Sequence, residues 1–326
     1  MEFYLGVDVS KAKVDAALLN KLGKYKTKVF PNTAAGSVAL VHWLNENALN
    51  DASQVHICME ATGTYHEQLA LHLHDHGLNV SVINPMKVKR FIELEGTRNK
   101  TDSADARSLA RFCRMTQPPM WLAPSRSVRA LQALVARLDT LQQIRQSELN
   151  RLDVAHGAVQ SSIQAIIATL DCNIEEVKSK IRQTIDDDPD LRQRDGLLQT
   201  IPGLGERTIP QLLAYIGDPQ RFKSIKQLAA FASLSPQIKQ SGSSLNKHQG
   251  THAQGHRELK RALYFPALVA SRFNPLIAAF SERLKAQNKP AKVVLVACMH
   301  KLLAIVLGVL KSGCPFDPTK KTHATA

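Results

Sequence analysis

The sequence predicts an α/β domain built on a mixed β-sheet, then a long helical hairpin, then a mainly helical domain. Three observations support this fold class. Short apolar or alternating segments open the chain, apolar residues recur at helical spacing over residues 126–185, and basic residues gather near the end. The 326 residues suffice for two compact domains and a connector. We therefore expect domains at residues 1–125, 126–190 and 191–326.

Three short strands are expected first, at Phe3–Val9, Lys13–Leu19 and Tyr25–Phe30, because these segments are apolar or alternating and are separated by tight polar turns. Helices and strands then alternate: helices over Thr33–Asn47 and Tyr65–His76, strands over Gln54–Met59 and Val80–Ile83, and a helix from Asp102. The resulting order, βββαβαβα, is that of the ribonuclease-H-like fold, in which helices flank a mixed sheet.

Two carboxylates begin the last of these helices. Asp102 and Asp105 are three residues apart, and residues at this spacing share one face of a helix. Two close like charges need a cation to stay ionised, and Mg²⁺ binds through a few carboxylates together with substrate phosphates. The pair therefore predicts half of a metal site. The alternative is a first helical turn enriched in aspartate, which complements the helix dipole.

Two further acids are expected beside this pair. Asp8 lies near the end of the first strand, and Glu60 directly follows the strand that ends at Met59. Both positions are carboxyl ends of strands that would be central and adjacent, where open α/β sheets bind ligands. A single acid at a strand end is common, but the joint placement of all four favours a Mg²⁺ site, at which Mn²⁺ can substitute. The proposed ligands are Asp8, Glu60, Asp102 and Asp105.

A basic run lies between the last strand of the sheet and the aspartate pair. Lysine and arginine beside a metal cluster suit the backbone of a nucleic acid, whereas a solvated helix face is the alternative. The residues expected to contact nucleic acid here are Lys87, Lys89, Arg90, Arg98 and Lys100.

The formal net charge of +14 is concentrated in the last part of the chain. Residues 1–197 hold 24 Lys and Arg against 23 Asp and Glu, a net charge of +1, whereas residues 198–326 hold 18 against 5, a net charge of +13. This asymmetry favours a polyanion-binding module joined to a nearly neutral one. A surface charged only for solubility is the alternative.

Apolar residues step by three or four on both sides of a break at Ala155-His156-Gly157. Such heptad seams predict an antiparallel coiled-coil hairpin. The hairpin either closes on itself or also supplies a self-association surface, so we expect a homodimer or tetramer; an internal bundle without a partner is the alternative. The seam positions are Leu131, Leu134, Leu138 and Leu141, then Ile163, Ile167, Leu170, Ile174, Val177, Ile181 and Ile185.

The segment Ile201-Pro202-Gly203-Leu204-Gly205 lies between two helical stretches and predicts a helix-hairpin-helix. The amides of such a turn, followed by a helix N-terminus, can accept a DNA phosphate without reading bases. Gly203, Gly205 and Arg207 are the expected contacts. A tight connection between two helices also requires glycines, which is the alternative.

A polar loop is expected over Ser235–Ser244, followed by a basic helix and then by a helical stretch from Arg272 to Leu310. A Ser/Gly-rich loop is usually a linker. This one is flanked by cations, which a serine needs in order to attack a phosphodiester. The flanking residues, also expected to contact nucleic acid, are Lys239, Lys247, Arg257, Lys260 and Arg261.

The five cysteines lack CxxC spacing, so we expect no zinc, a reducing compartment and small buried thiols. The first residues read as a strand without the basic start of a signal peptide. We also expect no apolar run long enough to span a bilayer and no membrane partner. These expectations favour a cytoplasmic protein associated with the nucleoid.

Several motifs together resemble the DEDD-type transposases of prokaryotic insertion sequences, the Piv/MooV-like recombinases. The resemblance covers nearly the whole chain. The motifs are Gly6-Val7-Asp8-Val9-Ser10-Lys11, Met59-Glu60-Ala61-Thr62-Gly63-Thr64-Tyr65, Asn84-Pro85, Arg98-Asn99-Lys100-Thr101-Asp102-Ser103-Ala104-Asp105-Ala106, Ile201-Pro202-Gly203-Leu204-Gly205, Ser241-Gly242-Ser243-Ser244 and Arg261-Ala262-Leu263-Tyr264.

The resemblance implies a RuvC-like domain with the four-acid Mg²⁺ site, a coiled-coil insertion, and a transposase domain whose serine nucleophile falls on Ser241. It implies that a structured RNA, the bridge RNA, pairs with donor and target DNA, and that strands are cut and rejoined through a phosphoserine-DNA intermediate. The chain departs from the family pattern at Asn246-Lys247 and Ala253-Gln254-Gly255, where a basic-Gly pair and a Lys before Gly are usual.

Three other functions remain open at this point. A RuvC-like structure-specific nuclease would keep the metal site and use water in place of the serine. The segment Gly6-Val7-Asp8-Val9-Ser10 also resembles the first phosphate loop of actin-like sugar kinases and ATPases, although a second Asp-x-Gly-Gly loop is missing from the sequence. A non-enzymatic RNA-binding scaffold is the third.

Overall fold

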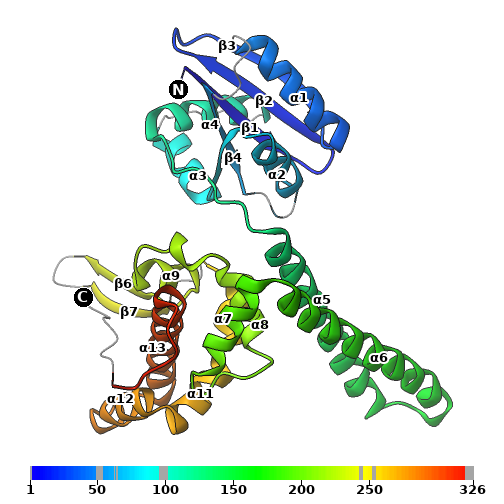
Figure 1. The fold of residues 1–326 in the computed structure, drawn as a ribbon, viewed down its shortest axis with the longest axis vertical. Helices are drawn as coiled ribbons and strands as arrows, with labels where there is room; N and C mark the ends of the chain where they lie inside the picture. The colour runs from blue at the N-terminus through cyan, green and yellow to red at the C-terminus, as the bar shows by residue number, and fades with distance from the viewer. Residues whose placement is uncertain are drawn as a thin grey trace. The chain divides into compact units, whose positions relative to one another are not determined.

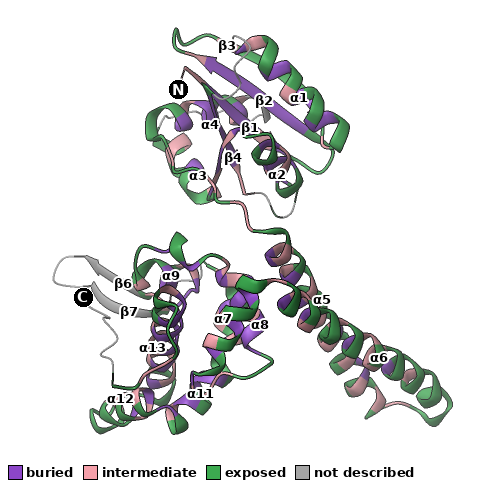
Figure 2. Cartoon of the chain, in the orientation of Figure 1, coloured by how far each residue is buried: buried purple, intermediate pink, exposed green. Residues whose placement is uncertain are grey.

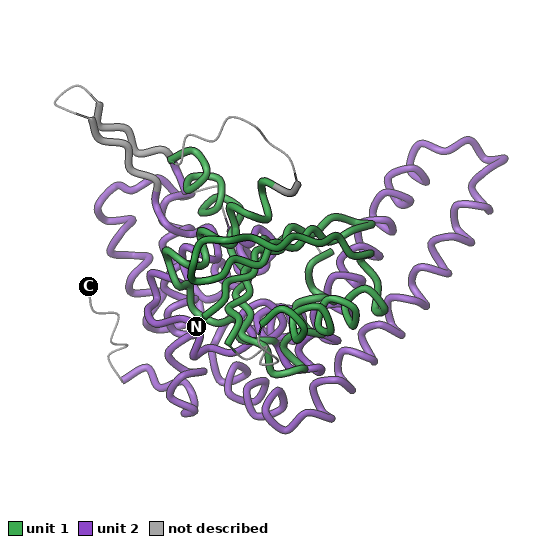
Figure 3. Tube along the Cα trace, turned by 90° about the horizontal axis from the view of Figure 1, so that it is seen from above, with its two compact units in different colours: residues 1–123 green, residues 124–326 purple. Residues whose placement is uncertain are grey.

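A computed structural model of the chain describes residues 2–48, 54–61, 63, 65–94, 102–241, 245–251 and 255–319 (Figure 1). Only the backbone is described for residues 102, 103, 237–241 and 245–249. The chain forms two compact units, Met1–Ala123 and Pro124–Ala326, which Figure 3 colours separately. The three-part domain division expected from the sequence stays a prediction.

The first unit is built on a five-stranded sheet in the order β3-β2-β1-β4-β5. The strands β1 (Phe3–Val9), β2 (Lys13–Asn20) and β3 (Tyr25–Pro31) form an antiparallel meander. The strands β4 (Val55–Glu60) and β5 (Asn79–Ile83) continue the sheet parallel to β1. The structure thus confirms the mixed sheet, with β1 and β4 adjacent in its interior.

Helices cover both faces of this sheet (Figure 1). Side chains alternate between the faces along each strand, so Leu5 and Val7 pack with α1 (Ala34–Asn47) and α2 (Glu67–Asp75). The opposite face, with Tyr4 and Cys58, packs against α3 (Pro85–Leu94) and α4 (Asp102–Thr116). The sequence marked Asn84-Pro85 only as a strand end; Pro85 also opens α3, since proline is tolerated at the first helical position.

The second unit begins with two long helices, α5 (Arg126–Leu152) and α6 (Gly157–Asp187), which pack side by side as a hairpin (Figure 1). Six of the eleven predicted seam residues, among them Ile167 and Ile174, are buried and the other five are partly buried, whereas the outward surfaces are largely exposed (Figure 2). Near its base, Val128 joins the core of the helical region. The hairpin pattern is therefore present, and supercoiling of the pair stays a prediction.

The rest of the second unit is mainly helical, as predicted. Its central element is α13, an apolar helix that packs against helices α7, α9, α11 and α12. The helices are α7 (Pro189–Gln199), α8 (Ile209–Ile216), α9 (Ile225–Phe231), α10 (Arg257–Ala262), α11 (Tyr264–Phe273), α12 (Pro275–Ala286) and α13 (Ala291–Ser312).

The sequence predicted a loop over Ser235–Ser244, and this prediction was wrong. Two strands, β6 (Pro236–Ser241) and β7 (Leu245–Thr251), pair antiparallel there. The sequence contains almost no apolar residues to mark them, because a two-stranded ribbon can be solvated on both faces and then lacks the alternation that identifies a half-buried strand.

The single helical stretch expected from Arg272 to Leu310 is also wrong in detail. It is interrupted at Asn274, whose side chain accepts hydrogen bonds from the amides of Leu276 and Ile277 at the start of α12. Pro275 has no amide hydrogen and cannot continue the preceding helix. A second interruption follows α12, so that α13 begins only at Ala291.

The expectation that no apolar run could span a bilayer was wrong for α13. This helix of 22 residues is long and apolar enough by length and composition alone. More than half of its most apolar window, 56%, is buried inside the unit. The apolar surface of α13 therefore serves as the core of a helical domain.

Candidate active site

The register of the sheet brings two of the predicted acids to the same edge. β1 and β4 pair in parallel with Val7 opposite Met59, so the next residues along each strand are Asp8 and Glu60. Both side chains are partly buried. By strand alternation each lies on the face that α4 covers, since Asp8 follows Gly6 by two residues and Glu60 follows Cys58 by two.

Helix α4 brings Asp105 to this edge. A Cβ atom on Gly6 would lie 1.9 Å from the carbonyl oxygen of Ala106, so α4 packs almost directly on the backbone of β1. Farther along α4, Cys113 Sγ lies 3.5 Å from the carbonyl oxygen of His56 near the start of β4. The helix therefore begins at the carboxyl end of the strands, and partly buried Asp105 lies in its first turn.

The fourth acid, Asp102, is the first residue of α4, and its side chain is outside the described residues. The elements β1, β4 and α4 thus bring Asp8, Glu60 and Asp105 toward one edge of the sheet, and Asp102 begins the same helix as Asp105. Carboxylate oxygens are the donors that Mg²⁺ prefers. The residues present fit such an ion, and no other donor type is needed.

Sequence reasoning missed a fifth carboxylate, Asp15. The β1–β2 register pairs it directly with Asp8, and residues opposite each other in an antiparallel pair share a face. Asp15 is 7% exposed, and Lys13 Nζ lies 3.1 Å from its carboxylate. In the sequence it occupied an ordinary polar position of an alternating strand. Only the pairing of β1 with β2 identifies it as a neighbour of the site.

The basic residues predicted near the acids are partly described. Lys87, Lys89 and Arg90 are exposed on α3 and flank buried Val88. Arg98 and Lys100 lie outside the described residues. Helix α3 packs against α4, so these three cations belong to the same layer as Asp105.

In the second unit, the two glycines of the predicted helix-hairpin-helix differ: Gly203 is tightly packed, and Gly205 is exposed. Gly203 has a φ of +102°, and a Cβ atom there would lie 2.7 Å from the Cβ of Ala270 in α11. Packing alone therefore requires this glycine. Gly205 is exposed, and Arg207 donates a hydrogen bond to Gln142 Oε1 at 2.9 Å. The phosphate-binding role of this turn stays a prediction.

Helix α10 gathers the predicted basic residues around a hollow of about 410 Å³. Arg257, Lys260 and Arg261 line it together with Tyr264 and Lys292. Arg261 also forms an ion pair with Asp139 of α5, so part of its charge is neutralised within the unit. Lys292 was not predicted as a contact, because it lies on α13, far from the other four in sequence.

Ser241 is the last residue of β6, and its backbone pairs with Leu245. Lys239 and Lys247 are partners across the same ribbon. The side chains of these residues are outside the described set. Ser241 lies in the second unit, whereas the four acids lie in the first.

The cysteines are only partly as expected. Cys58, Cys113 and Cys298 are buried, but Cys172 and Cys314 are exposed. Cys58 and Cys113 lie beside His56. This group lies below the acidic edge, the end of the sheet that carries Asp8, Glu60 and Asp105. Burial raises the pKa of the Cys113 thiol and lowers the pKa of His56. Both thiol and imidazole are therefore neutral in these surroundings.

Two family models and two known proteins match most of this chain in sequence. A family model described as "Transposase", of the DEDD type of IS110, matches residues 5–155, and one described as "Transposase IS116/IS110/IS902 family" matches residues 195–282. The chain is 34% identical over 322 residues to the pilin gene-inverting proteins of Moraxella bovis and Moraxella lacunata, covering 98% of this chain and 98% of each relative. Among solved structures, RuvC of Thermus thermophilus in complex with a Holliday junction substrate is 12% identical with a TM-score of 0.27, covering 37% of this chain and 100% of that one.

Proposed function

Since the chain belongs to the IS110-type family of DEDD transposases and is therefore a DNA recombinase, we propose that four carboxylates and one serine carry out its reaction. The carboxylates are those of Asp8, Glu60, Asp102 and Asp105, and the serine is Ser241. The observation that carries the proposal is the parallel register of β1 and β4, which brings Asp8 and Glu60 side by side near the carboxyl ends of these strands, on the face against which α4 packs.

The four carboxylates would hold Mg²⁺, or Mn²⁺ in its place. When bound, the ion would neutralise the scissile phosphate and stabilise the leaving oxygen. The chain's own part is to hold the acids rigidly: Gly6 lets α4 sit on β1, which fixes Asp105 relative to Asp8.

In the proposed reaction, Ser241 Oγ forms a bond to phosphorus as the bond from phosphorus to the deoxyribose oxygen breaks. The phosphoserine keeps the energy of the phosphodiester, so that another strand end can be joined without ATP. The serine proton passes to a base, for which His248 is a candidate in β7. The register of Lys239 with Lys247, two residues from the serine, supports a cationic setting for this step.

Guidance by a structured bridge RNA is part of the proposal. Support comes from the net charge of +13 in residues 198–326 and from the hollow lined by Arg257, Lys260, Tyr264 and Lys292. An aromatic ring among cations suits single-stranded nucleic acid, because bases stack on the ring while cations meet phosphates. Sequencing RNA that co-purifies with the protein tests this point, and nucleic-acid-free protein that still recombines its DNA would contradict it.

We further propose that the protein acts as a homo-oligomer on chromosomal DNA in the cytoplasm. Exposed apolar residues on the hairpin, Ile144, Val159 and Ile166, support a self-association surface there. A dimer or tetramer would hold donor and target DNA together. Light scattering of full-length protein measures the state directly.

The central experiment assays recombination of a donor and target pair. Asp8→Asn, Glu60→Gln and Asp105→Asn should each lower activity on the order of 10²–10³-fold, because each removes a charge that stabilises the transition state. The matched control is Asp75→Asn, which changes an exposed acid of the same unit. Full activity in all three site variants would overturn the metal assignment.

The rival with an observation in its favour is a RuvC-like nuclease that uses water, because the acidic edge alone would suffice for it. Ser241→Ala separates the two. A nuclease keeps cutting after this change, whereas the proposed recombinase loses both cutting and joining and forms no covalent adduct with DNA.

A further inference from the structure

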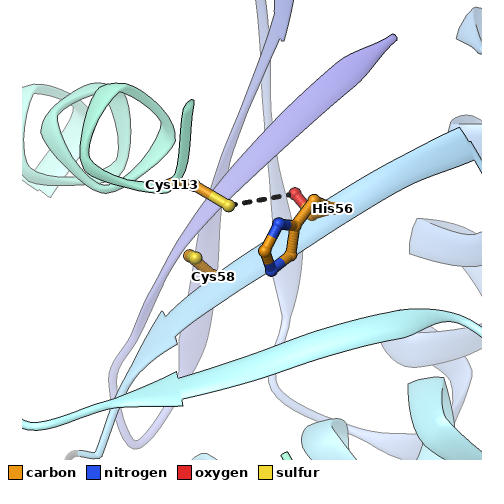
Figure 4. A group of neighbouring side chains, drawn as sticks. All are labelled: His56, Cys58 and Cys113. Carbon is orange, nitrogen blue, oxygen red and sulfur yellow. Dashed lines mark hydrogen bonds between the residues drawn. The ribbon is translucent and has the colours of Figure 1, made fainter. Parts of the chain in front are cut away.

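Three buried side chains of the first unit form a group that the proposed reaction does not use. His56 and Cys58 are two residues apart in β4, so both side chains lie on the same face of the sheet. Cys113 reaches this face from α4 (Figure 4). An imidazole nitrogen and the two sulfur atoms all lie within 4.8 Å of one another. His56 is 3% exposed, and both cysteines are fully buried. The group therefore links a strand to a helix in the interior.

The hydrogen bonds around His56 determine which ring nitrogen carries the proton. Ser81 Oγ lies 2.8 Å from His56 Nε2, and the same Oγ donates to the carbonyl oxygens of Pro119 at 2.9 Å and Pro118 at 3.2 Å. A serine hydroxyl has one proton, and the proline carbonyls can only accept, so the contacts are all satisfied when Ser81 donates to a proline and Nε2 donates its hydrogen to Ser81. His56 Nδ1 therefore keeps its lone pair.

The lone pair of Nδ1 is positioned for a ligand. Figure 4 shows the ring with an edge turned toward both sulfur atoms. Histidines that bind metals usually donate their other ring hydrogen to a neighbouring oxygen, which fixes the ring. Ser81 plays that part for His56, and it is itself completely buried.

We propose that His56, Cys58 and Cys113 bind one Zn²⁺ ion. An imidazole nitrogen and two thiolates are typical zinc ligands, and two thiolate charges balance the ion, so that no net charge is left in apolar surroundings. On binding, two Zn–S bonds and one Zn–N bond form while two S–H bonds break and both protons pass to solvent. Binding replaces the hydrogen bond that the Cys113 thiol donates to the carbonyl oxygen of His56 at 3.5 Å.

The role of this ion is to hold β4 and α4 together. Glu60 follows Cys58 by two residues, about 7 Å along a strand. Asp105 precedes Cys113 by eight residues, about 12 Å along a helix. The ion thus lies below the acidic edge and fixes the two elements that carry these acids, without reaching the edge itself.

The test is titration of the reduced full-length protein with Co²⁺ and then Zn²⁺. Cobalt bound by thiolates gives a sulfur-to-metal charge-transfer band that carboxylates and imidazoles do not give. We expect one equivalent of Co²⁺ with this band, displaced by one equivalent of Zn²⁺. Cys58→Ser and Cys113→Ser should each weaken or abolish it. Cys172→Ser, which changes an exposed thiol, and Asp8→Asn, which changes the acidic edge, should keep it.

Two measurements keep the test decisive if a serine variant does not fold. In the wild-type protein, Zn²⁺ should raise the unfolding temperature. In mild denaturant, where buried thiols become reachable, Zn²⁺ should slow the alkylation of Cys58 and Cys113 but not that of Cys172. Ser81→Ala keeps all three ligands and removes the acceptor of His56 Nε2, so it should weaken Zn²⁺ binding about 10–100-fold. A wild-type protein without the thiolate band, or one isolated with a Cys58–Cys113 disulfide and no zinc, overturns the proposal.

Discussion

Gly6 in β1 and Ala106 in α4 pack so closely that a Cβ atom on the glycine would lie 1.9 Å from the alanine carbonyl oxygen. The backbone of α4 thereby comes closer to the sheet than any side chain would allow. Because Asp105 precedes Ala106 and Asp8 follows Gly6 on the same face, this contact fixes the distance between two predicted metal ligands.

Gly6→Ala should therefore displace α4 and lower recombination at least tenfold, with a loss of about 1–3 kcal/mol in unfolding free energy from overpacking. Recombination assays and chemical denaturation measure the two effects. The control is Gly196→Ala in α7, where a new Cβ atom meets no neighbour within 4 Å. Equal activity of Gly6→Ala and wild type would mean that the position of α4 does not matter for the reaction.

Asp15→Asn should raise the Mg²⁺ concentration needed for half-maximal recombination several-fold. Asp15 is buried opposite Asp8, so its charge adds to the field that attracts a cation to the acidic edge. A Mg²⁺ titration of activity measures the shift. Asp75→Asn again provides the exposed control, and an unchanged titration curve would limit Asp15 to its ion pair with Lys13.

The acids and Ser241 lie in different units, so they need not come from one subunit. If the working site combines acids of one protomer with the serine of another, a mixture of Asp105→Asn and Ser241→Ala proteins should recover activity that neither has alone. The recombination assay on mixtures measures this. A mixture as inactive as its components would favour a site built within one chain.

Charge in the hairpin seam should destabilise the second unit. Ile167 and Ile174 are only 9% and 6% exposed, so Ile167→Asp and Ile174→Asp place a carboxylate in an apolar contact and should lower the unfolding free energy by about 3–5 kcal/mol. Ile166 is 46% exposed, and Ile166→Asp is the matched control. Chemical denaturation distinguishes them, and equal stability of all three variants would place the seam elsewhere.

Acid should also destabilise the second unit through His256. Burial lowers the pKa of this residue below its ordinary 6.5, and its Nδ1 accepts a hydrogen bond from the Leu259 amide at the start of α10. Because the folded protein favours the neutral ring, its contribution is complete above pH 6.5 and is lost as the pH falls below that value.

Unfolding temperatures at about pH 7.5 and about pH 5.5 measure this loss. His256→Asn keeps a capping oxygen without a titrating ring and should show a smaller loss than wild type. His42→Asn, which changes an exposed histidine of α1, should match wild type. An equal loss in the His256 variant would assign the acid sensitivity to other groups.

Local pattern was enough for the strands of the first unit, since β1, β2 and β3 are apolar or alternating and are separated by polar turns, but it did not predict helix α3. It also placed Asp8 and Glu60 at strand ends. Asp15 could be recognised as a neighbour of the acids only from the strand register, which pairs it with Asp8. The His56, Cys58 and Cys113 group was invisible for the same reason: residues of a strand and a distant helix meet only after folding, whereas spacing along the chain suggested no zinc.

The same limit applies to the second unit. The β6–β7 ribbon has too few apolar residues to be recognised, and Lys292 joins Arg257 and Lys260 only through the packing of α13 beside α10 and α11. The break between α11 and α12 was missed because it depends on one buried side chain, Asn274, which accepts hydrogen bonds from the first amides of α12.

Helix α13 follows every other helix of its unit in the chain, yet it supplies the centre of their core. During synthesis, the first unit has all its strands available early and can close its sheet while later residues are still being added. The second unit cannot do so, because α7, α9, α11 and α12 present their apolar faces to water until α13 leaves the ribosome. Premature termination before Ala291 would thus leave a folded, nearly neutral first unit, with the proposed metal ligands, attached to an aggregation-prone remainder.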